Sequence, residues 1–274
     1  MKLAGKVAVV TGASGVLCSE MARALAAEGC RLALLNRHAE SAEALKASLA
    51  AEGHREVIVT TADVLDRPSL EAARDRVLRE WGRIDILLNG AGGNHPSGTT
   101  KVEQMEEGTP LEDGFFGLDL GGFEGVNRLN LMGTILPSQV FGQAMLGGGG
   151  CILNVSSMGA TQPLTKVGGY SAAKAGVENF TRWLAVHLAK LGVRVNAVSP
   201  GFFITEQNRF LMLEADGKTP TARGKKALAK TPMARFGEAK DLRGVTVFLC
   251  SDEASFVTGV VIPVDGGFLA YSGV

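Results

Sequence analysis

Tyr170 and Lys174 are the side chains whose types and spacing most directly suggest chemistry. They are four positions apart in a segment that we expect to be helical, so they share a face of that helix. A free tyrosine has a pKa of about 10 and is a poor acid–base catalyst. A nearby ammonium group would lower that pKa toward working pH, as general acid–base catalysis requires. Taken alone, the pair is equally typical of a helix surface.

Ser157 lies 13 positions before Tyr170, directly after an apolar run and Ser156. Its hydroxyl can donate to a carbonyl oxygen and hold that oxygen beside Tyr170; Ser156 is the alternative donor. The four histidines lack the spacing of metal ligands, and no GxSxG motif of a hydrolase is present. The sequence therefore predicts proton transfer at a carbonyl or alcohol oxygen, without a metal ion.

Four further signals follow apolar runs that we expect to be strands. They are Thr11-Gly12-Ala13-Ser14-Gly15, Asp63-Val64, Asn89-Gly90-Ala91-Gly92, and Pro200-Gly201 with Thr205 nearby. The carboxyl ends of parallel strands meet at one edge of a sheet, where ligands bind. Gly12 and Gly15 would let the backbone approach a phosphate, and the next helix N-terminus would offer free N–H groups. Asp63 could accept a hydrogen bond from an adenine amino group. Each signal alone fits an ordinary turn, but four on one edge predict a dinucleotide site.

The end of the second expected strand bears on the choice between NAD and NADP. An acidic residue there would accept from the ribose 2′-hydroxyl and repel a 2′-phosphate. This chain has Asn36-Arg37 instead, and Arg37 could bind the phosphate as a charged fork. We therefore expect NADP(H) to be favoured over NAD(H), although a solvated arginine at a helix start would also fit.

These side chains must be positioned by a scaffold of alternating apolar runs and helical patterns. The expected strands are 6–10, 31–35, 56–60, 84–88, 151–155, 194–199 and 260–264, and the expected helices are 16–28, 39–51, 69–81, 123–145, 169–191 and 238–250. Continuous apolar strands between helices predict an α/β fold, a Rossmann-type doubly wound parallel sheet of about seven strands with helices on both faces. Without a linker or repeat, we expect one domain over 1–274, with substrate loops near 93–125 and 201–231.

The composition narrows the class of partner. The 28 basic and 28 acidic side chains give a formal net charge of zero, which argues against a nucleic-acid binder. No stretch approaches the roughly 18 apolar residues of a membrane helix. The four cysteines have no zinc-site spacing and suggest reduced thiols. We expect a small-molecule substrate, no nucleic acid or membrane as partner, and a cytoplasmic location.

The order and spacing of these motifs resemble the short-chain dehydrogenase/reductase family over essentially the whole chain. The resemblance runs from Thr11-Gly12 through the motifs above to the tail Asp265-Gly266-Gly267. It implies a nicotinamide cofactor, a homotetramer and catalytic roles for Ser157, Tyr170 and Lys174. By the same resemblance, Asn130 would hold a water that links Lys174 to solvent. The implied cofactor-binding positions are Gly12, Ser14, Gly15, Val16, Leu17, Asn36, Arg37, Asp63, Val64, Asn89, Ala91, Gly92, Tyr170, Lys174, Pro200, Gly201 and Thr205.

One departure from the family lies in the first turn. The usual pattern TGxxxGxG would place glycines at 16 and 18, where this chain has Val16 and Cys18. Those glycines normally let the backbone meet the pyrophosphate and the helix pack closely on the strand. We expect altered geometry at the phosphate, and not the loss of the cofactor.

The presumed substrate loops carry a narrower resemblance within this family. Gly93-Asn94-His95-Pro96, the turn at 15–18 and the segment 201–209 together resemble its D-mannonate oxidoreductases (fructuronate reductases). A sugar acid would need a carboxylate partner, for which Arg209 is the candidate. Its hydroxyls could meet Asn94, His95, Gln162 and Asn208, although these loops would equally fit surface or oligomer contacts. The alternatives are a 3-oxoacyl carrier-protein reductase, a gluconate 5-dehydrogenase-like enzyme, or a cofactor-sensing regulator without catalysis.

Overall fold

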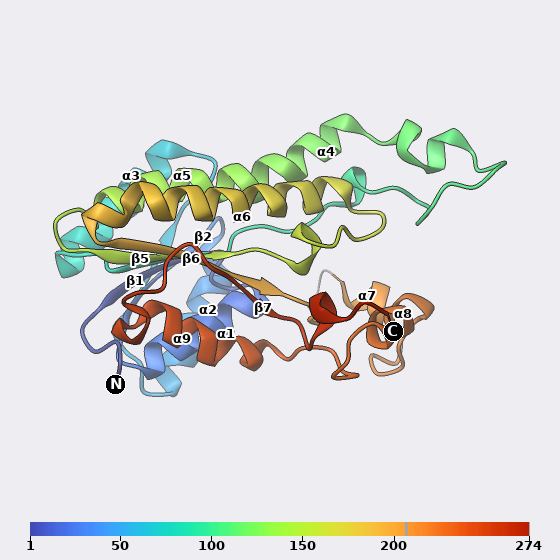
Figure 1. The fold of residues 1–274 in the computed structure, drawn as a ribbon. Coiled ribbons are helices and arrows are strands. Elements are labelled where there is room, and N and C mark those ends of the chain that lie inside the picture. Colours follow the sequence, from blue (N-terminus) through green and yellow to red (C-terminus); the bar gives the residue numbers. More distant parts are fainter. Residues whose placement is uncertain (206–207, 274) are drawn as a thin grey trace.

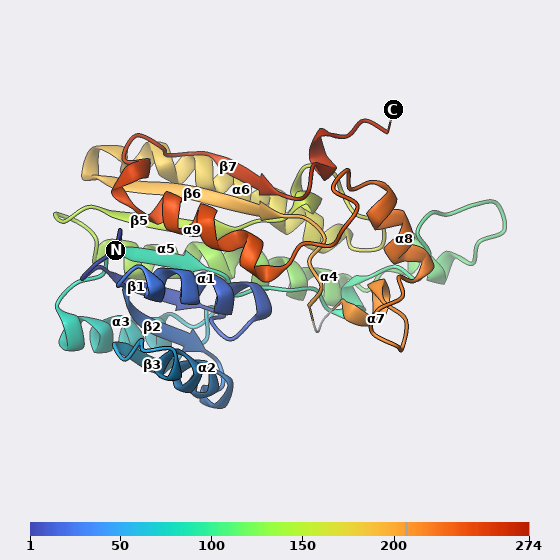
Figure 2. The same ribbon diagram turned by 90° about the horizontal axis from the view of Figure 1, so that it is seen from below.

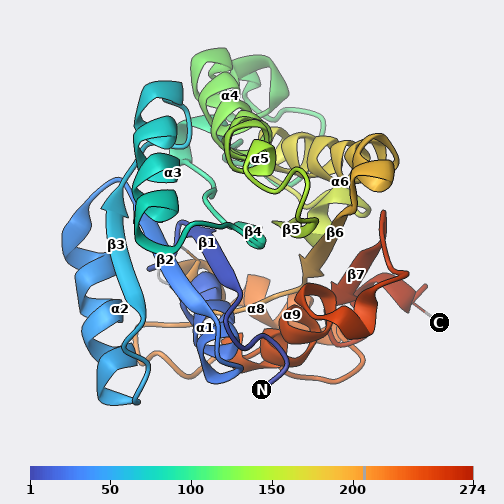
Figure 3. The ribbon, with the colours of Figure 1, turned by 90° about the vertical axis from the view of Figure 1, so that its left-hand side faces the viewer.

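The computed structural model describes residues 1–205 and 208–273; Glu206 and Gln207, which belong to the expected loop 201–231, and Val274 lie outside the described residues. One parallel sheet of seven strands runs through the molecule in the order β3-β2-β1-β4-β5-β6-β7 (Figure 3). Its strands are β1 (Val7–Thr11), β2 (Arg31–Asn36), β3 (Val57–Thr61), β4 (Ile86–Asn89), β5 (Gly150–Val155), β6 (Val193–Pro200) and β7 (Val261–Val264). The expected doubly wound sheet is confirmed, and its order reverses between β1 and β4, where such folds bind ligands.

Helices cover both faces of the sheet (Figures 1 and 2). One layer contains α3 (Arg67–Trp81), α4 (Leu120–Asn127), α5 (Gly133–Gln143) and α6 (Gly168–Leu188), and the other contains α1 (Val16–Ala27), α2 (Ala39–Ala51) and α9 (Arg243–Cys250). The short helices α7 (Arg209–Met212) and α8 (Ala222–Ala229) lie beyond the carboxyl ends of the strands. No helix among the described residues is long and apolar enough to span a bilayer.

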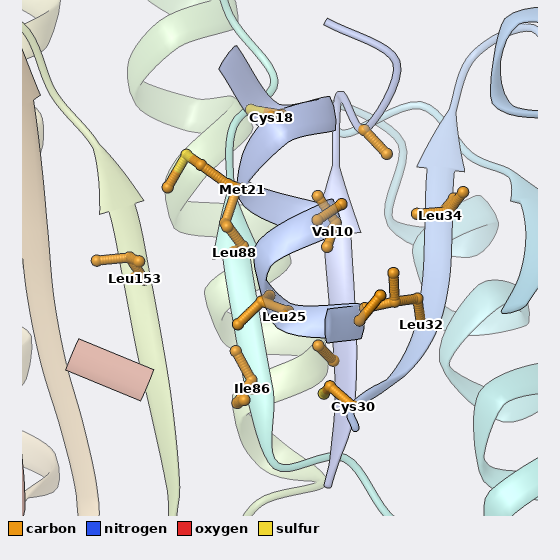
Figure 4. Packing of buried hydrophobic residues seen from close by; sticks show 14 of the residues in the cluster. Val10, Cys18, Met21, Leu25, Cys30, Leu32, Leu34, Ile86, Leu88 and Leu153 are labelled. Atoms are coloured by element: carbon orange, nitrogen blue, oxygen red, sulfur yellow. The ribbon is translucent and has the colours of Figure 1, made fainter. Parts of the chain in front are cut away.

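Alternating strand residues build two separate cores. Along β1, Ala8 and Val10 pack with α1 on one face, whereas Val7 and Val9 pack with α3 and α5 on the other. This division follows from the two-residue period of a strand. In Figure 4, Met21 and Leu25 of α1 lie against the side chains of the central strands. Both faces of the sheet are therefore buried, as the continuous apolar runs predicted.

The start of α3 differs from the expected 69–81. The helix begins two residues earlier because the Asp66 carboxylate caps it, accepting a hydrogen bond from the Ser69 backbone N–H at 3.1 Å. Pro68 lies in the first turn, where its missing N–H costs nothing. The helix ends at Gly82, whose φ of 72° is the left-handed conformation common at helix C-termini.

Three other expected helices are less regular than predicted. The segment 123–145 is divided into α4, a π-helical turn at Arg128–Met132 and α5. The segment 238–250 begins as a 3₁₀ turn before α9, and the segment 169–191 ends as a 3₁₀ turn after α6. The helices α7 and α8 lie inside the loop expected at 201–231 and were not predicted.

Candidate functional site

A cavity of about 410 Å³ opens at the carboxyl edge of the sheet. It brings together residues from the first turn, the ends of β4, β5 and β6, and α6, α7 and α8. Of the sequence-predicted site residues, it is lined by Ser14, Gly15, Val16, Leu17, Gly92, Asn94, Ser157, Tyr170, Lys174, Pro200, Gly201, Thr205 and Asn208. The four predicted strand-end signals therefore do meet at one edge, although Asp63 and Val64 lie outside this cavity lining.

Ser157, Tyr170 and Lys174 lie together in this cavity. Ser157 follows β5 and caps a short 3₁₀ turn by accepting a hydrogen bond from the Gly159 N–H at 3.1 Å. Tyr170 and Lys174 come from consecutive turns of α6, and the Lys174 ammonium lies 5.7 Å from the Tyr170 ring centroid. Lys174 is buried, and its Nζ donates to the Val155 carbonyl at 2.8 Å. The arrangement places two hydroxyls and one buried cation where a carbonyl oxygen can enter.

In this arrangement Lys174 does not lower the pKa of Tyr170, and the lowering expected from an oxidised nicotinamide stays a prediction. Burial raises the pKa of Tyr170, and the hydrogen bond with Ser157 opposes that rise only in part. The Lys174 ammonium lies over the ring and donates its hydrogen bond to the Val155 carbonyl. Burial also lowers the pKa of Lys174 to about 8. Tyr170 is therefore a protonated hydroxyl at neutral pH, suited to donate a proton.

Ser156, the alternative to Ser157, has a different environment. Its hydroxyl donates to the Glu178 carboxylate at 3.0 Å on the buried side of α6. The Ser157 side chain instead forms a hydrogen bond with the Tyr170 side chain. The geometry therefore favours Ser157 as the residue that holds a substrate oxygen.

The first turn fits the pyrophosphate of a dinucleotide. Gly15 is the N-cap of α1 and carries no side-chain cap, so the first N–H groups of this 12-residue helix lack a side-chain acceptor. Val16 and Leu17 begin the helix and line the cavity. Gly12 has a φ of 62°, and a Cβ there would lie 2.8 Å from Ala91 Cα, so only glycine allows the two loops to approach. This helix start can bind an anionic group.

Cys18 occupies the position where the family pattern has its third glycine. Its side chain is buried between α1 and the end of β4. A Cβ at Gly90 would lie 2.0 Å from the Cys18 sulfur, so the missing side chain of Gly90 provides the space that the thiol fills. Close packing of α1 against the end of β4 is thus retained, with the glycine at position 90 after the strand and not on the helix. Val16, at the helix start, is partly exposed toward the cavity.

The predicted adenosine side of the site is built from the ends of β2 and β3. The Asn36 amide bonds with both the N–H and the hydroxyl of Ser14, so it fixes the first turn to β2. Arg37 is exposed beside it. One Asp63 oxygen accepts from the Leu65 N–H at 2.8 Å, which leaves its other oxygen for a ligand. Val64 is buried and packs close to Gly133 of α5.

The loop after β4 is held by side chains on two sides. The Thr11 hydroxyl accepts from the N–H groups of Gly90 and Ala91, at 3.1 and 3.2 Å. Asn130, fully buried in the π-helical turn, accepts from the Gly93 N–H and donates to the Gly93 carbonyl. Its oxygen also approaches Gly92, where a Cβ would lie 2.6 Å from it. Asn130 therefore fixes this loop beside Lys174; the water that the resemblance assigns to it stays a prediction.

Asn89 lies below the same loop in a buried polar layer. Its amide nitrogen donates to Ser138 and to Asn154, both at 2.9 Å. Asn154 in turn donates to Thr181 of α6. Asn89 thus ties β4 to β5 and α5 and does not line the cavity.

The five residues expected to bind substrate divide into two groups. Asn94 and Asn208 line the cavity, but the Asn208 amide is bonded to the Thr205 N–H and the Phe203 carbonyl and stabilises its own loop. His95, Gln162 and Arg209 are exposed and do not line it. His95 instead caps a short turn through Ser97, and Arg209 lies on α7. Arg209 is therefore misplaced for a carboxylate partner in this cavity.

Arg223 lines the cavity and was missed by sequence reasoning. It lies in the first turn of α8, and its guanidinium bonds with Glu103 and Thr165. No motif marks this arginine, because its acidic partner is 120 positions away. Its only sequence signal is that it falls within the expected loop 201–231.

A second cavity, of about 550 Å³, lies between Phe202, Met233 and the tail at Asp265–Gly267. Its charged lining residues are Arg235, Asp241 and Asp265, of which Arg235 and Asp241 form an ion pair at 2.7 Å. Neither Tyr170 nor Lys174 reaches it. The chemistry predicted from the sequence therefore belongs to the smaller cavity.

Comparisons with known proteins place the chain among oxidoreductases. The family described as enoyl-(acyl carrier protein) reductase matches residues 12–269. The "uncharacterized oxidoreductase UxuB" of Bacillus subtilis is 52% identical over 99% of this chain and 98% of its own. The D-threitol dehydrogenase of Mycolicibacterium smegmatis is 36% identical over 97% and 94% of the two chains, and the 2-dehydro-3-deoxy-D-gluconate 5-dehydrogenase of Escherichia coli is 34% identical over 98% and 97%.

The solved structures include a similar protein with a bound cofactor. A Haemophilus influenzae protein, provisionally described as a D-mannonate oxidoreductase and solved with bound NAD, superposes with a TM-score of 0.94. It is 43% identical, and the match covers 100% of this chain and 98% of that one. Levodione reductase superposes with a TM-score of 0.83 at 32% identity, covering 98% of both chains.

Proposed function

Because the chain belongs to the short-chain dehydrogenase/reductase family and is an oxidoreductase with a pyridine-nucleotide cofactor, we propose that it interconverts a ketone and a secondary alcohol on a sugar acid. D-fructuronate and D-mannonate are the proposed pair. The observation that carries this proposal is the meeting of Ser157, Tyr170 and Lys174 in the cavity at the strand edge.

The proposed mechanism assigns one task to each of these residues. The Ser157 hydroxyl donates to the substrate carbonyl oxygen and holds it beside Tyr170. Tyr170, which burial keeps protonated, gives its hydroxyl proton to that oxygen as the alcohol forms. Lys174, held by its bond to the Val155 carbonyl, places its positive charge beside the Tyr170 ring. A nicotinamide cofactor, which the first turn and the loop after β6 would hold, would serve as the hydride donor or acceptor for the substrate carbon. Asn130 keeps the loop at Gly93 in place beside Lys174.

The dinucleotide is proposed to lie along the edge from the first turn to the end of β6. Its pyrophosphate would meet the free N–H groups at the start of α1, and its adenine would meet the second oxygen of Asp63. Pro200, Gly201 and Thr205 line the cavity on the β6 side, next to the proposed nicotinamide. Arg37, exposed directly after β2 where an NAD enzyme would carry an acidic residue, supports NADP(H) over NAD(H). The H. influenzae protein, in contrast, was solved with bound NAD.

The sugar-acid substrate is supported by the cavity and by the relatives. The lining adds Asn94 and Thr205 to the hydroxyl pair, and Arg223 adds a cation that a carboxylate could meet. Two relatives and two solved neighbours are named for sugar acids, namely two 2-dehydro-3-deoxy-D-gluconate 5-dehydrogenases, the D-mannonate oxidoreductase and a gluconate dehydrogenase. The alternative, a 3-oxoacyl carrier-protein reductase, shares only the carrier-protein substrate with the name of the matching family, which refers to an enoyl reductase.

The proposal also extends to assembly and location. Exposed apolar side chains on α6, chiefly Trp183 and Val186, support the homotetramer expected from the family. Cys18, Cys30, Cys151 and Cys250 are all free and buried, which supports a reducing, cytoplasmic compartment.

The test of the proposed function is a substrate comparison. Oxidation of NADPH and of NADH would be followed with D-fructuronate, 5-keto-gluconate and an acetoacetyl thioester. We expect the highest kcat/KM with a keto sugar acid. A preference for the thioester would overturn the proposed substrate class, and cofactor binding without any turnover would favour the regulator.

A further inference from the structure

We propose that Arg223 binds the carboxylate of the substrate and makes the enzyme specific for acids over neutral ketoses. This inference rests on the proposed function, because it concerns the same cavity. It transfers to Arg223 the role that the sequence suggested for Arg209.

Position is the first argument. Arg223 lies in the first turn of α8, which Thr221 caps by accepting a hydrogen bond from the Gly224 N–H at 3.0 Å. The side chain is 21% exposed and lines the cavity that contains Ser157 and Tyr170. An acid that presents its ketone to the two hydroxyls can therefore present its carboxylate to Arg223 within one cavity.

The hydrogen bonds of Arg223 leave donors unused. Its Nη1 donates to Glu103 at 2.9 Å and to Thr165 Oγ1 at 3.0 Å, and its Nη2 donates to the Thr165 carbonyl at 3.2 Å. Guanidinium has five N–H donors in a fixed plane. The Nε–H and one Nη2–H make none of these bonds, and these two groups form the edge that a carboxylate binds in a bidentate manner. The bonds to Thr165 and Glu103 hold that edge in a fixed orientation.

The local charge balance favours an anion. Glu103 is shared between Arg223 and Lys226, at 2.9 Å from each, so the three side chains carry a net charge of one positive unit. The two cations lower the pKa of Glu103, which keeps it ionised at neutral pH. Among the described residues that line the cavity, Lys174 and Arg223 are the cations. Because Lys174 is bonded to Val155 beside Tyr170, Arg223 is the cation left for the substrate carboxylate.

A purely structural role is the competing explanation. Glu103 belongs to the long loop after β4, so the Arg223–Glu103 pair also joins the two loops around the cavity. Lys226 makes the same tie to Glu103 but does not line the cavity. Lys226→Leu is therefore a matched control that weakens the tie and leaves the cavity unchanged.

The experiment compares D-fructuronate with D-fructose, a ketose of the same length that lacks the carboxylate. We expect Arg223→Leu to lower kcat/KM for the acid by about 10- to 100-fold, as for a lost hydrogen bond to a charged group, and to change kcat/KM for fructose by less than about threefold. Arg223→Lys should restore part of the preference for the acid, because it keeps the charge without the fork. Lys226→Leu should leave the acid-to-neutral ratio unchanged, and thermal unfolding should confirm that each variant is folded.

Two outcomes would contradict the account in distinguishable ways. If the wild-type enzyme itself does not prefer the acid, the proposed sugar-acid function fails and this inference with it. If the wild-type enzyme prefers the acid and Arg223→Leu keeps this preference, for example by lowering kcat/KM for both substrates by the same factor, the proposed function stands. Arg223 would then be only a structural link between the two loops.

Discussion

Lys174 shows how the demands of catalysis and stability conflict at a single residue. A lysine that is almost fully buried loses the solvation of its charge, and burial lowers its pKa to about 8. Below pH 8 the folded protein therefore contains a buried ammonium that the unfolded chain would expose to water. In the proposed mechanism, this cost is the consequence of placing a positive charge beside the Tyr170 ring.

The variant Lys174→Met tests this conflict. We expect turnover to be lost and the free energy of unfolding to rise by about 1–3 kcal/mol at pH 7, since methionine carries no charge to bury. The pKa of Lys174 in the folded state lies below its free value, so the unfolded chain holds more protons between about pH 8 and 10.5. The free energy of unfolding of the wild type therefore rises through this range, and its difference from that of Lys174→Met shrinks. Chemical denaturation of both proteins at pH 7 and pH 10 measures the difference between their free energies of unfolding. A gap that is equal at the two pH values would refute the role of charge burial.

Arg37 is the residue on which the cofactor preference depends. It is exposed at the end of β2, where an acid would select NAD. We expect Arg37→Ala to raise KM for NADPH by about tenfold, as for a lost charged hydrogen bond, with little change for NADH. Equal effects on the two cofactors would remove the argument for NADP(H).

The same scale shows what the sequence can reveal about single residues. Helix spacing and a strand end mark Tyr170, Lys174 and Ser157 as candidates, and the family resemblance implies their catalytic roles. Arg223 could not be predicted, because it reaches the cavity only through α8, and its partner Glu103 comes from a distant loop. The narrower resemblance of the segment 201–209 pointed to Arg209 instead, which lies on α7 and does not line the cavity.

At the scale of the elements, α1 packs tightly against the end of β4. The Cys18 sulfur fills the space that Gly90 leaves. We expect Gly90→Ala to destabilise the protein by about 1–3 kcal/mol through overpacking. In a double-mutant cycle, Cys18→Ala should recover part of that loss, with a coupling energy of about 0.5–3 kcal/mol. Denaturant unfolding of the four proteins gives the coupling, and strictly additive losses would show that the two positions do not share this space.

Secondary-structure elements could be predicted where one pattern extends over the whole element. All seven strands agree to within two residues, because each is a continuous apolar run between turns. The expected helix 123–145 is wrong in its middle, where the structure has a π-helical turn at Arg128–Met132, and Asn130 of this turn bonds to Gly93 across the loop. That contact joins residues 37 positions apart and has no periodic signature.

At the scale of the whole molecule, exposed apolar side chains on α6 bear on how the chains assemble. Trp183 is 56% and Val186 is 81% exposed on α6, and Trp183 stacks on His187 with ring centroids 4.9 Å apart. We expect light scattering to give four times the chain mass of 28.6 kDa. Trp183→Glu with Val186→Glu should lower that mass, because a buried interface would then contain unpaired charges. A wild-type mass of 28.6 kDa would contradict the proposed tetramer.

The whole fold serves to bring the ends of β1, β4, β5 and β6 to one edge and to place α6 beside them. The central claim is that Tyr170 transfers the proton at that edge while its neighbours hold substrate and cofactor. Its most direct test is Tyr170→Phe, which removes one oxygen atom, assayed for turnover with D-fructuronate and for NADPH and NADH binding by fluorescence. We predict that kcat falls by about 10²- to 10⁴-fold while the dissociation constant for the preferred cofactor changes by less than about threefold. Turnover at the wild-type rate would contradict the account.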